Sequence, residues 1–345
     1  MDPKVALFDD PLFRRHDAGK GHPERPERLE AVRRGIWQAG LEPRLLMKAP
    51  RDATTAELLR VHTPGHVAQV ASTAGRSYRF DADTQAGPES YAAALLAAGA
   101  AAGAVDRVLD KEVDRAFCAV RPPGHHALAG RAMGFCLFNN VAVAAAHALS
   151  RGLKRVMIVD FDVHHGNGTQ AIFYSDPRVL YVSSHQWPFY PGTGGVDEVG
   201  EGDGRGFNVN LPLPAGQADG EYAKVYREIV EPIGRAFDPE LVLVSAGFDA
   251  HKDDPLAGME LTPAGYSQLM DVCLGIAGGA AGGRMVVVLE GGYGLPAMAY
   301  SAAAVVKALL GEPPEEVGSV KSTALGQMVG DYRRALRPFW PVLGG

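Results

Sequence analysis

Residues 155–168 read RVMIVDFDVHHGNG, an apolar run that passes directly into a cluster of polar residues. A short β-branched run followed by polar and glycine residues is typical of a buried strand. The same pattern recurs three times, with RPPGHH after residues 115–120, SAGFD ending at Asp249, and EGGYG after residues 285–289. Each of these four stretches predicts a strand that carries polar side chains at its carboxyl end.

Outward from these stretches, apolar runs alternate with longer segments of helical periodicity. This alternation predicts an α/β fold, with a central, mainly parallel sheet and helices on both faces. No Pro/Ser-rich linker divides the chain, so we expect residues 1–345 to form a single domain. The expected strands are 5–8, 115–120, 155–159, 179–182, 241–245 and 285–289, and the expected helices are 89–109, 140–151, 220–237, 262–277 and 297–310.

The composition restricts the class of partner and the compartment. The net charge of −6, with both signs interspersed, argues against a nucleic-acid partner and mildly favours a cationic substrate. The N-terminal residues MDPKVALFDDP lack the features of a signal peptide, and the Ala-rich stretch 91–105 is shorter than a membrane span of ~20 residues. Three cysteines in apolar surroundings indicate reduced, packed thiols. We therefore expect a cytoplasmic protein that is not in a membrane.

Three residues at the predicted strand ends have the chemistry of an open metal site. Asp162 and His164 are two positions apart, so their side chains point to the same side, and Asp249 ends another strand. Catalytic zinc sites use three such nitrogen and oxygen ligands and leave one position for water. An isolated D-x-H could equally be a hydrogen-bonded loop. The four acidic and imidazole side chains within residues 160–165 favour the metal interpretation.

Further polar groups are expected at the same edge, because parallel sheets bind ligands at the carboxyl ends of strands. His125 and His126 follow the rigid RPPG turn and could transfer protons near neutral pH. Tyr293 lies between glycines and could direct its hydroxyl at a developing oxyanion. The alternatives are incidental surface histidines and a packed aromatic residue. The joint order of the motifs favours a catalytic site.

The motifs RPPGHH, DFDVHHGNG, HQWPFYPGTGG, SAGFDAHKDDPL and LEGGYG occur in an order that resembles the zinc-dependent histone deacetylases and their bacterial homologues. The resemblance covers nearly the whole chain, from HPERPERL onwards. The chain looks like the class II branch, because Asn167 stands where class I members usually carry Asp. The EGGY motif, in place of GGGY, points the same way.

The resemblance implies a role for each matching residue. Asp162, His164 and Asp249 match the ligands of one zinc ion, and Tyr293 matches the tyrosine that polarises the scissile carbonyl. His126 matches the general base and acid, and His125 its electrostatic partner, oriented by Asp160. In this mechanism zinc-bound water attacks the amide, and His126 protonates the leaving amine. Because Asn167 is neutral, we expect the proton affinities of the two histidines to differ from those in class I enzymes.

The resemblance also implies a narrow channel for a linear alkyl chain, and structural potassium. The channel walls match Phe135 and Tyr190, with Gly134 and Gly292 as backbone positions. Arg28 matches an arginine proposed to line an acetate exit, and its alternative is a surface salt bridge. Oxygen ligands suit a hard cation. The possible potassium ligands are Asp160, Asp162, His164 and Ser183, and more distantly Phe173, Asp176, Val179 and Phe207.

Two alternative enzyme classes can be compared with this chain at single positions, Gly166 and Leu256. Arginase-like binuclear sites use D-x-H-x-D, and Gly166 occupies the position of the second carboxylate here. Polyamine-selective class II relatives carry a Glu seven residues after the third zinc ligand, where this chain has Leu256. We therefore expect acyl-lysine in proteins or peptides as the substrate, with acetylpolyamines as the alternative. A catalytically inactive acyl-lysine-binding module would usually lack a ligand or the tyrosine. The sequence leaves a homo-oligomer open.

Overall fold

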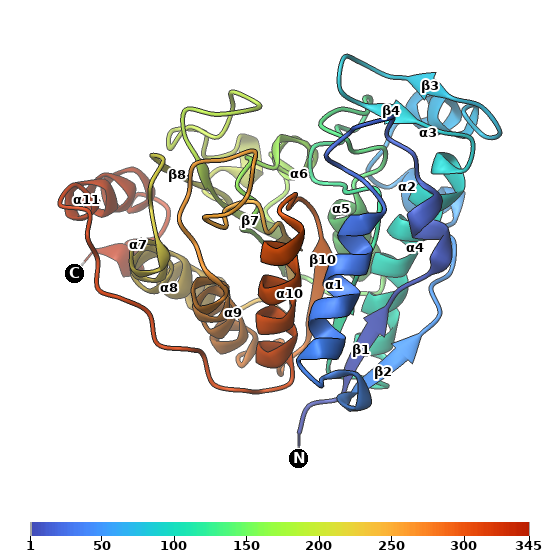
Figure 1. Ribbon diagram of the computed structural model, residues 1–345. Coiled ribbons are helices and arrows are strands. Elements are labelled where there is room, and N and C mark those ends of the chain that lie inside the picture. The colour runs from blue at the N-terminus through green and yellow to red at the C-terminus, as the bar shows by residue number, and fades with distance from the viewer. Residues whose placement is uncertain (1, 345) are drawn as a thin grey trace.

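Eight strands form one sheet in the computed structural model, which describes residues 2–344 (Figure 1). The strand order is β2-β1-β5-β10-β9-β6-β7-β8, and every pair of neighbours in it is parallel. The expected α/β fold is therefore confirmed. The strands are β1 (Val5–Phe8), β2 (Leu45–Lys48), β5 (Arg115–Cys118), β6 (Val156–Asp160), β7 (Val179–Gln186), β8 (Asn208–Leu213), β9 (Leu241–Ala246) and β10 (Met285–Leu289).

All six predicted strands are present in this sheet, and the two strands of the sheet that were not predicted are its edges. Edge strand β2 is half exposed, so it lacks the continuous apolar run of a central parallel strand. Edge strand β8 contains asparagines and Pro212, and proline within a strand is tolerated mainly at edges. Both therefore lack the pattern by which buried strands are recognised.

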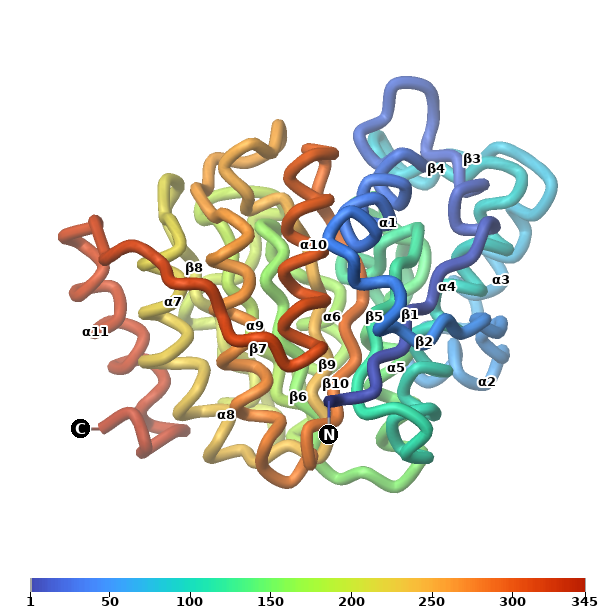
Figure 2. Tube along the Cα trace, turned by 60° about the horizontal axis from the view of Figure 1, so that its bottom comes forward, coloured from blue at the N-terminus to red at the C-terminus, as the bar shows by residue number. Residues whose placement is uncertain are grey.

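Helices cover both faces of the sheet. One face is covered by α1, α7, α8, α9 and α10, and the other by α4, α5 and α6 (Figures 1 and 2). The main helices are α1 (Glu27–Gln38), α2 (Thr55–Leu58), α3 (Pro64–Ala71), α4 (Ser90–Leu109), α5 (Asn140–Ser150), α6 (Asn167–Phe173), α7 (Asp219–Val225), α8 (Glu231–Phe237), α9 (Pro263–Ala277), α10 (Leu295–Leu309) and α11 (Leu325–Leu336).

The predicted helix over 220–237 is confirmed, and its hydrogen-bond pattern changes along its length. A π-helical turn, η4 (Tyr226–Val230), separates α7 from α8, and Pro232 follows in the first turn of α8. Proline has no N–H to donate, so it interrupts the regular hydrogen-bond pattern. The helix expected from residue 262 is confirmed, with Thr262 as N-cap and proline next.

Helix α4 is longer than the apolar stretch expected from the sequence. At 20 residues it is long and apolar enough to cross a membrane by length and composition, so the expectation that this segment is too short was wrong. However, 67% of its most apolar window is buried inside the protein, where it packs on α5 and the sheet. This burial is typical of a core helix. Cys118, Cys136 and Cys273 are free and buried, as expected.

The sheet order brings the four polar stretches together. Strands β5, β10, β9 and β6 are consecutive neighbours, and all four end at the same edge, which is the upper edge in Figure 1. The register places Asp160 of β6 beside Ser245 of β9 and Ser183 of β7. A short antiparallel pair, β3 (Tyr78–Arg79) and β4 (Gln85–Ala86), lies above the same edge.

Candidate active site

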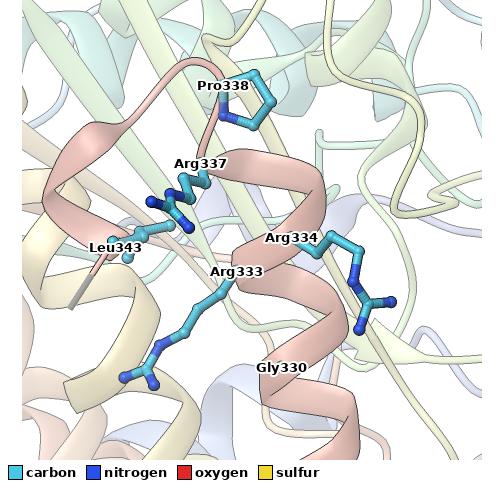
Figure 3. Close-up of a pocket in the computed structure, with 7 residues that line it drawn as sticks. Gly330, Arg333, Arg334, Arg337, Pro338 and Leu343 are labelled. Atoms are coloured by element: carbon cyan, nitrogen blue, oxygen red, sulfur yellow. The ribbon is translucent and has the colours of Figure 1, made fainter.

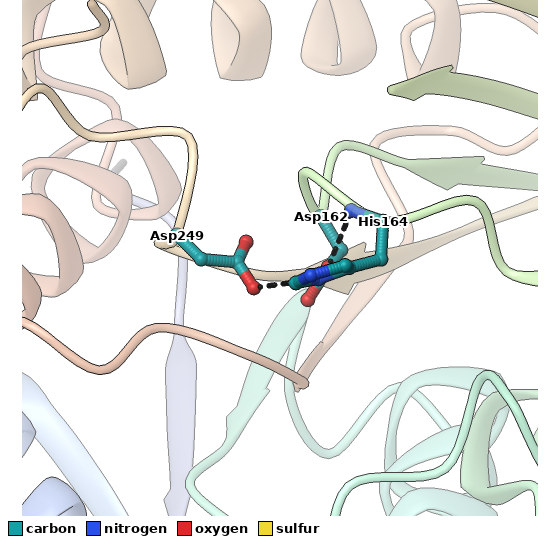
Figure 4. A group of neighbouring side chains, drawn as sticks. All are labelled: Asp162, His164 and Asp249. Carbon is teal, nitrogen blue, oxygen red and sulfur yellow. Dashed lines mark hydrogen bonds and ion pairs between the residues drawn. The ribbon is translucent and has the colours of Figure 1, made fainter. Parts of the chain in front are cut away.

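Asp162, His164 and Asp249 converge beyond the ends of β6 and β9 (Figure 4). One ligand atom from each lies within 4.8 Å of the others. His164 Nδ1 is 3.1 Å from Asp162 Oδ1 and 3.2 Å from Asp249 Oδ2. Both carboxylates are fully buried, and buried charges are normally paired or bound to metal. The donor set and its spacing therefore fit one metal ion.

The surroundings of the carboxylates support this fit. Asp162 Oδ2 accepts a hydrogen bond from Gly291 N at 2.7 Å, and Asp249 Oδ1 accepts one from Val163 N at 2.9 Å. Asp249 Oδ2 is buried and has no hydrogen-bond partner among the described residues. A side chain at Gly291 would overlap both carboxylates. The backbone thus orients the two groups and leaves one oxygen available for a cation.

The position of Gly166 bears on the number of metals. A Cβ there would overlap Asp160 and the Tyr181 hydroxyl, and it would lie 3.1 Å from His125 Nδ1. A second-metal carboxylate at this position would need rearrangement of the hydrogen bonds between these groups. A single metal per chain stays a prediction.

His125 and His126 lie side by side, with ring centroids 4.0 Å apart, and differ in their partners. His125 Nδ1 is 3.0 Å from Asp160 Oδ2, and His126 Nδ1 is 2.8 Å from Asn167 Oδ1. Although burial lowers it, the pKa of His125 is raised to about 10 by Asp160 and Asp162. Burial, with His125 and His164 adding to it, holds the pKa of His126 well below its usual value. The two neighbouring rings therefore differ in proton affinity, and that of His126 is the lower.

Asn167 determines the tautomer of His126. Its Nδ2 donates to the sulfur of Met133 at 3.4 Å, which directs its Oδ1 towards the imidazole. An amide oxygen only accepts, so His126 Nδ1 carries the hydrogen and Nε2 has the free lone pair. A neutral acceptor gives this orientation and raises the pKa of His126 less than a carboxylate would.

Replacing Asn167 with aspartate is expected to change the pH dependence. A carboxylate in hydrogen-bond contact favours the protonated ring and raises the pKa of His126, by roughly one unit or more. Because protonated His126 cannot accept a proton, the acidic limb of kcat/KM should move to higher pH. The measurement is a pH profile of kcat/KM on an acetylated lysine peptide. An unmoved limb would show that another group controls it.

Tyr293 approaches the same point from the loop after β10. It is 8% exposed, and its ring meets Phe135 edge-on with centroids 6.0 Å apart. The guanidinium carbon of Arg28 lies 5.0 Å from the centre of the Tyr293 ring. The tyrosine is therefore fixed between an aromatic wall and a cation, with its side chain lining the cavity described next.

Several of these residues line one narrow cavity of about 90 Å³. Its walls include His125, His126, His164 and Tyr293, so the structure brings the predicted base, metal site and tyrosine together. The predicted channel residues Phe135, Tyr190, Leu256 and Gly134 also line it, whereas Gly291 lines it in place of the predicted Gly292. The lining set is Asp83, Pro123, His125, His126, Gly134, Phe135, His164, Tyr190, Leu256, Gly291 and Tyr293.

Two residues beside the cavity were not found by sequence reasoning. Asp83, exposed in the turn between β3 and β4, lines the solvent end together with Tyr190, which is 39% exposed. Phe189 stacks on the His164 ring, with centroids 5.3 Å apart and planes at 20°. Asp83 follows no apolar strand, and Phe189 lies three residues beyond the end of β7. The only available signals were an aspartate in a polar turn and the FYPGTG segment.

Arg28 is not on the surface, so the alternative of a surface salt bridge is wrong. The side chain is fully buried and bonds to Glu24 at 2.9 Å, to the carbonyl of Gly292 at 2.6 Å, and to the carbonyl of Glu290. Glu24 is also bonded by Arg121. The cluster thus ties α1 to the EGGYG and RPPGHH loops.

The possible potassium ligands form two groups. Asp160 and Ser183 are paired across β6 and β7, and Asp162 and His164 follow β6 directly. In the second group, the carbonyl of Phe173 accepts the Asp176 N–H at 3.0 Å, and that of Asp176 accepts the Val179 N–H at 3.2 Å. The Phe207 carbonyl accepts the Tyr181 N–H at 2.9 Å. Potassium binding at either group stays a prediction.

A larger hollow of about 570 Å³ beside α11 is a different kind of site (Figure 3). Its arginines are partly neutralised, since Arg333 pairs with Glu228 at 3.0 Å and Arg334 with Asp331 at 2.9 Å. None of its lining residues is a carboxylate, histidine or nucleophile. It therefore offers no chemistry comparable to that of the narrow cavity. Its lining residues are Gly330, Arg333, Arg334, Arg337, Pro338, Leu343 and Gly344.

Comparisons with known proteins agree with the geometry. Residues 22–309 match the Histone deacetylase domain family. The chain is 46% identical to histone deacetylase 15 of Arabidopsis thaliana over 331 residues, which is 93% of this chain and 59% of that protein. It is 38% identical to a probable deacetylase of Archaeoglobus fulgidus, covering 95% of this chain and 96% of the relative.

The similar proteins also include a deacetylase named for polyamines and a domain whose structure has been solved. The chain is 41% identical to human polyamine deacetylase HDAC10, over 93% of this chain and 50% of that protein. A crystal structure of the HDA15 HD domain has a TM-score of 0.94 and 43% identity, covering 99% of this chain and 96% of that one. Several curated relatives are thus much longer proteins, of which the chain spans about half.

Proposed function

Because the chain belongs to the histone deacetylase family, we propose that it is a zinc-dependent hydrolase that removes acetyl or other acyl groups from lysine side chains of proteins or peptides. The observation that carries this proposal is a cluster of three potential metal ligands, one of which, His164, lines a narrow cavity together with His126 and Tyr293. We also propose one catalytic domain over residues 1–345, since the core includes residues from Val5 to Leu343.

A zinc ion held by Asp162, His164 and Asp249 would supply a Lewis acid for the substrate carbonyl and for water. Neutral His126 accepts a proton at Nε2 and returns it to the leaving amine. The Tyr293 hydroxyl donates a hydrogen bond to the oxyanion as charge develops there. Cationic His125, paired with Asp160, keeps the proton affinity of His126 low. Structural potassium at the oxygen groups described above belongs to the same proposal.

The cavity walls bear on the choice of substrate. Phe135 and Tyr190 are the aromatic part of a lining that suits an alkyl chain, and Leu256 adds an apolar wall. A leucine cannot pair with the secondary ammonium of an acetylpolyamine, so lysine is favoured. One observation supports the second candidate, acetylpolyamine hydrolysis. The carboxylate of Asp83 lines the solvent end of the cavity and could pair with a substrate cation.

The test is a side-by-side assay of zinc-reconstituted protein on acetyl-lysine peptides, longer acyl-lysine peptides and acetylated polyamines. We expect the highest kcat/KM on an acyl-lysine peptide. The Leu256→Glu variant should gain activity on acetylpolyamines relative to peptides by about tenfold, equivalent to ~1.4 kcal/mol of discrimination. A wide preference of the unmodified protein for acetylpolyamines would replace the lysine proposal. No activity on any of these substrates would contradict the enzyme proposal itself.

A further inference from the structure

Asp254 is a buried carboxylate whose hydrogen bonds all go to backbone groups around the cavity. It is 7% exposed and lies in the loop after β9, five residues beyond Asp249. Its Oδ2 accepts the Tyr293 N–H at 2.6 Å and the Gly294 N–H at 2.9 Å. Its Oδ1 accepts the Leu256 N–H at 3.0 Å. One side chain therefore joins the tyrosine segment to the apolar wall.

Other groups hold most of the backbone of the tyrosine segment, but not the N–H groups of residues 293 and 294. Carbonyl groups of residues 290 and 292 are held by Arg28 on the side of α1, and Gly291 N bonds to Asp162. The N–H groups of Tyr293 and Gly294 bond only to Asp254 among the described residues. Gly294 is also the N-cap of α10, and it has no other side-chain cap. Removal of the Asp254 side chain would leave the N–H groups of Tyr293 and Gly294 without acceptors, directly beside the Tyr293 side chain.

We infer that Asp254 is a positioning residue, which fixes the Tyr293 hydroxyl for the oxyanion and couples it to the wall formed by Leu256. This inference rests on the proposed function for its catalytic meaning. Asp254 does not line the cavity, so it acts through Tyr293 and Leu256 without touching the substrate. Burial and nearby Asp249 raise the pKa of Asp254 to about 6, so above this pH the ionised carboxylate can accept from all three donors.

The Asp254→Asn variant tests the positioning role with a smaller change to the fold than the removal of the whole side chain. In Asp254→Asn one oxygen can still accept from the Tyr293 side, but the NH₂ group then faces the Leu256 N–H, so all three bonds cannot persist. The alanine variant removes every acceptor and is the more severe change. Glu221 provides a matched control, since it is 2% exposed and accepts the backbone N–H groups of Lys321 and Ser322 away from the cavity.

The experiment combines a double-mutant cycle with a spectroscopic measurement. Tyr293→Phe should lower kcat by about 100-fold or more, as for the loss of one oxyanion donor. Asp254→Asn should lower kcat about tenfold with little change in KM, but should have almost no further effect in the Tyr293→Phe background, because coupled residues are non-additive. Glu221→Gln should leave kcat unchanged. Equal losses in both backgrounds would overturn the inference.

The second measurement is independent of activity. In protein labelled with 3-fluorotyrosine, the ¹⁹F resonance of Tyr293 is assigned by its absence in Tyr293→Phe. Asp254→Asn should shift or broaden this resonance, Asp254→Ala should do so more strongly, and Glu221→Gln should leave it in place. An unmoved resonance in Asp254→Asn would overturn the inference. If the unsubstituted protein shows no deacylase activity, the proposed function fails, while this resonance still tests whether Asp254 fixes Tyr293.

Discussion

Replacing Asp249 with asparagine is expected to abolish deacylation and to remove the metal. The unsubstituted protein should bind about one zinc per chain, as an open three-ligand site does. Loss of the carboxylate removes one of three ligands, so zinc affinity should fall by more than the roughly 10–100-fold lost when a residue hydrogen-bonded to a ligand is replaced. Metal content after dialysis and turnover of an acetyl-lysine peptide give the two measurements. Two tightly bound metals per chain would instead revive a binuclear, arginase-like site.

The same variant separates ligation from folding. Burial, together with nearby Asp162, raises the pKa of Asp249, so its charged form is disfavoured without a cation. Asparagine retains an oxygen that can accept the Val163 N–H. In the presence of a chelator, the variant should therefore melt at a temperature no lower than that of the chelated parent. Asp253→Asn is the matched control, because this side chain is 70% exposed in the same loop and should change neither metal content nor turnover.

Much of the site was predictable because parallel strands share an edge. Asp162, His164 and Asp249 follow apolar runs, and β6 and β9 are direct neighbours in the sheet, so their polar ends had to meet. His126 and Tyr293 follow β5 and β10, which complete the same row of four strands. The pattern of apolar strands followed by polar residues was therefore enough to predict both the fold and the residues at the centre of the site.

What could not be predicted depends on loops and on contacts distant in sequence. Asp83 reaches the cavity from a turn about 80 residues before Asp162, and nothing in a single sequence fixes where such a turn lies. Asp254 stood in a recognised motif, but its role depends on three N–H groups, two of which are about 40 residues away. The burial of Arg28 likewise depends on Glu24 and on carbonyls after β10. Hydrogen bonds to distant backbone leave no periodic signal.

Replacing His126 with alanine is expected to lower kcat by about 10²–10⁴-fold at neutral pH, the usual contribution of general acid–base catalysis. Its imidazole lines the cavity beside His164, with ring centroids 6.0 Å apart, and Nε2 is its free proton acceptor. Alanine has no group to accept or return the proton. Steady-state kinetics on an acetyl-lysine peptide measure the loss, and zinc content should stay near that of the parent, since His126 is not a proposed ligand.

His22→Ala is the control for removing an imidazole near the cavity. The His22 ring packs edge-on against Phe135, with centroids 4.4 Å apart, but it does not line the cavity, so turnover should stay close to the parent rate. The pH profile then distinguishes a base from a packing residue. Because burial and cationic His125 hold the pKa of His126 low, the acidic limb of the parent should lie below the ordinary histidine value. That limb should disappear in His126→Ala. A variant that retains both the limb and the parent rate would assign the proton transfer to another group.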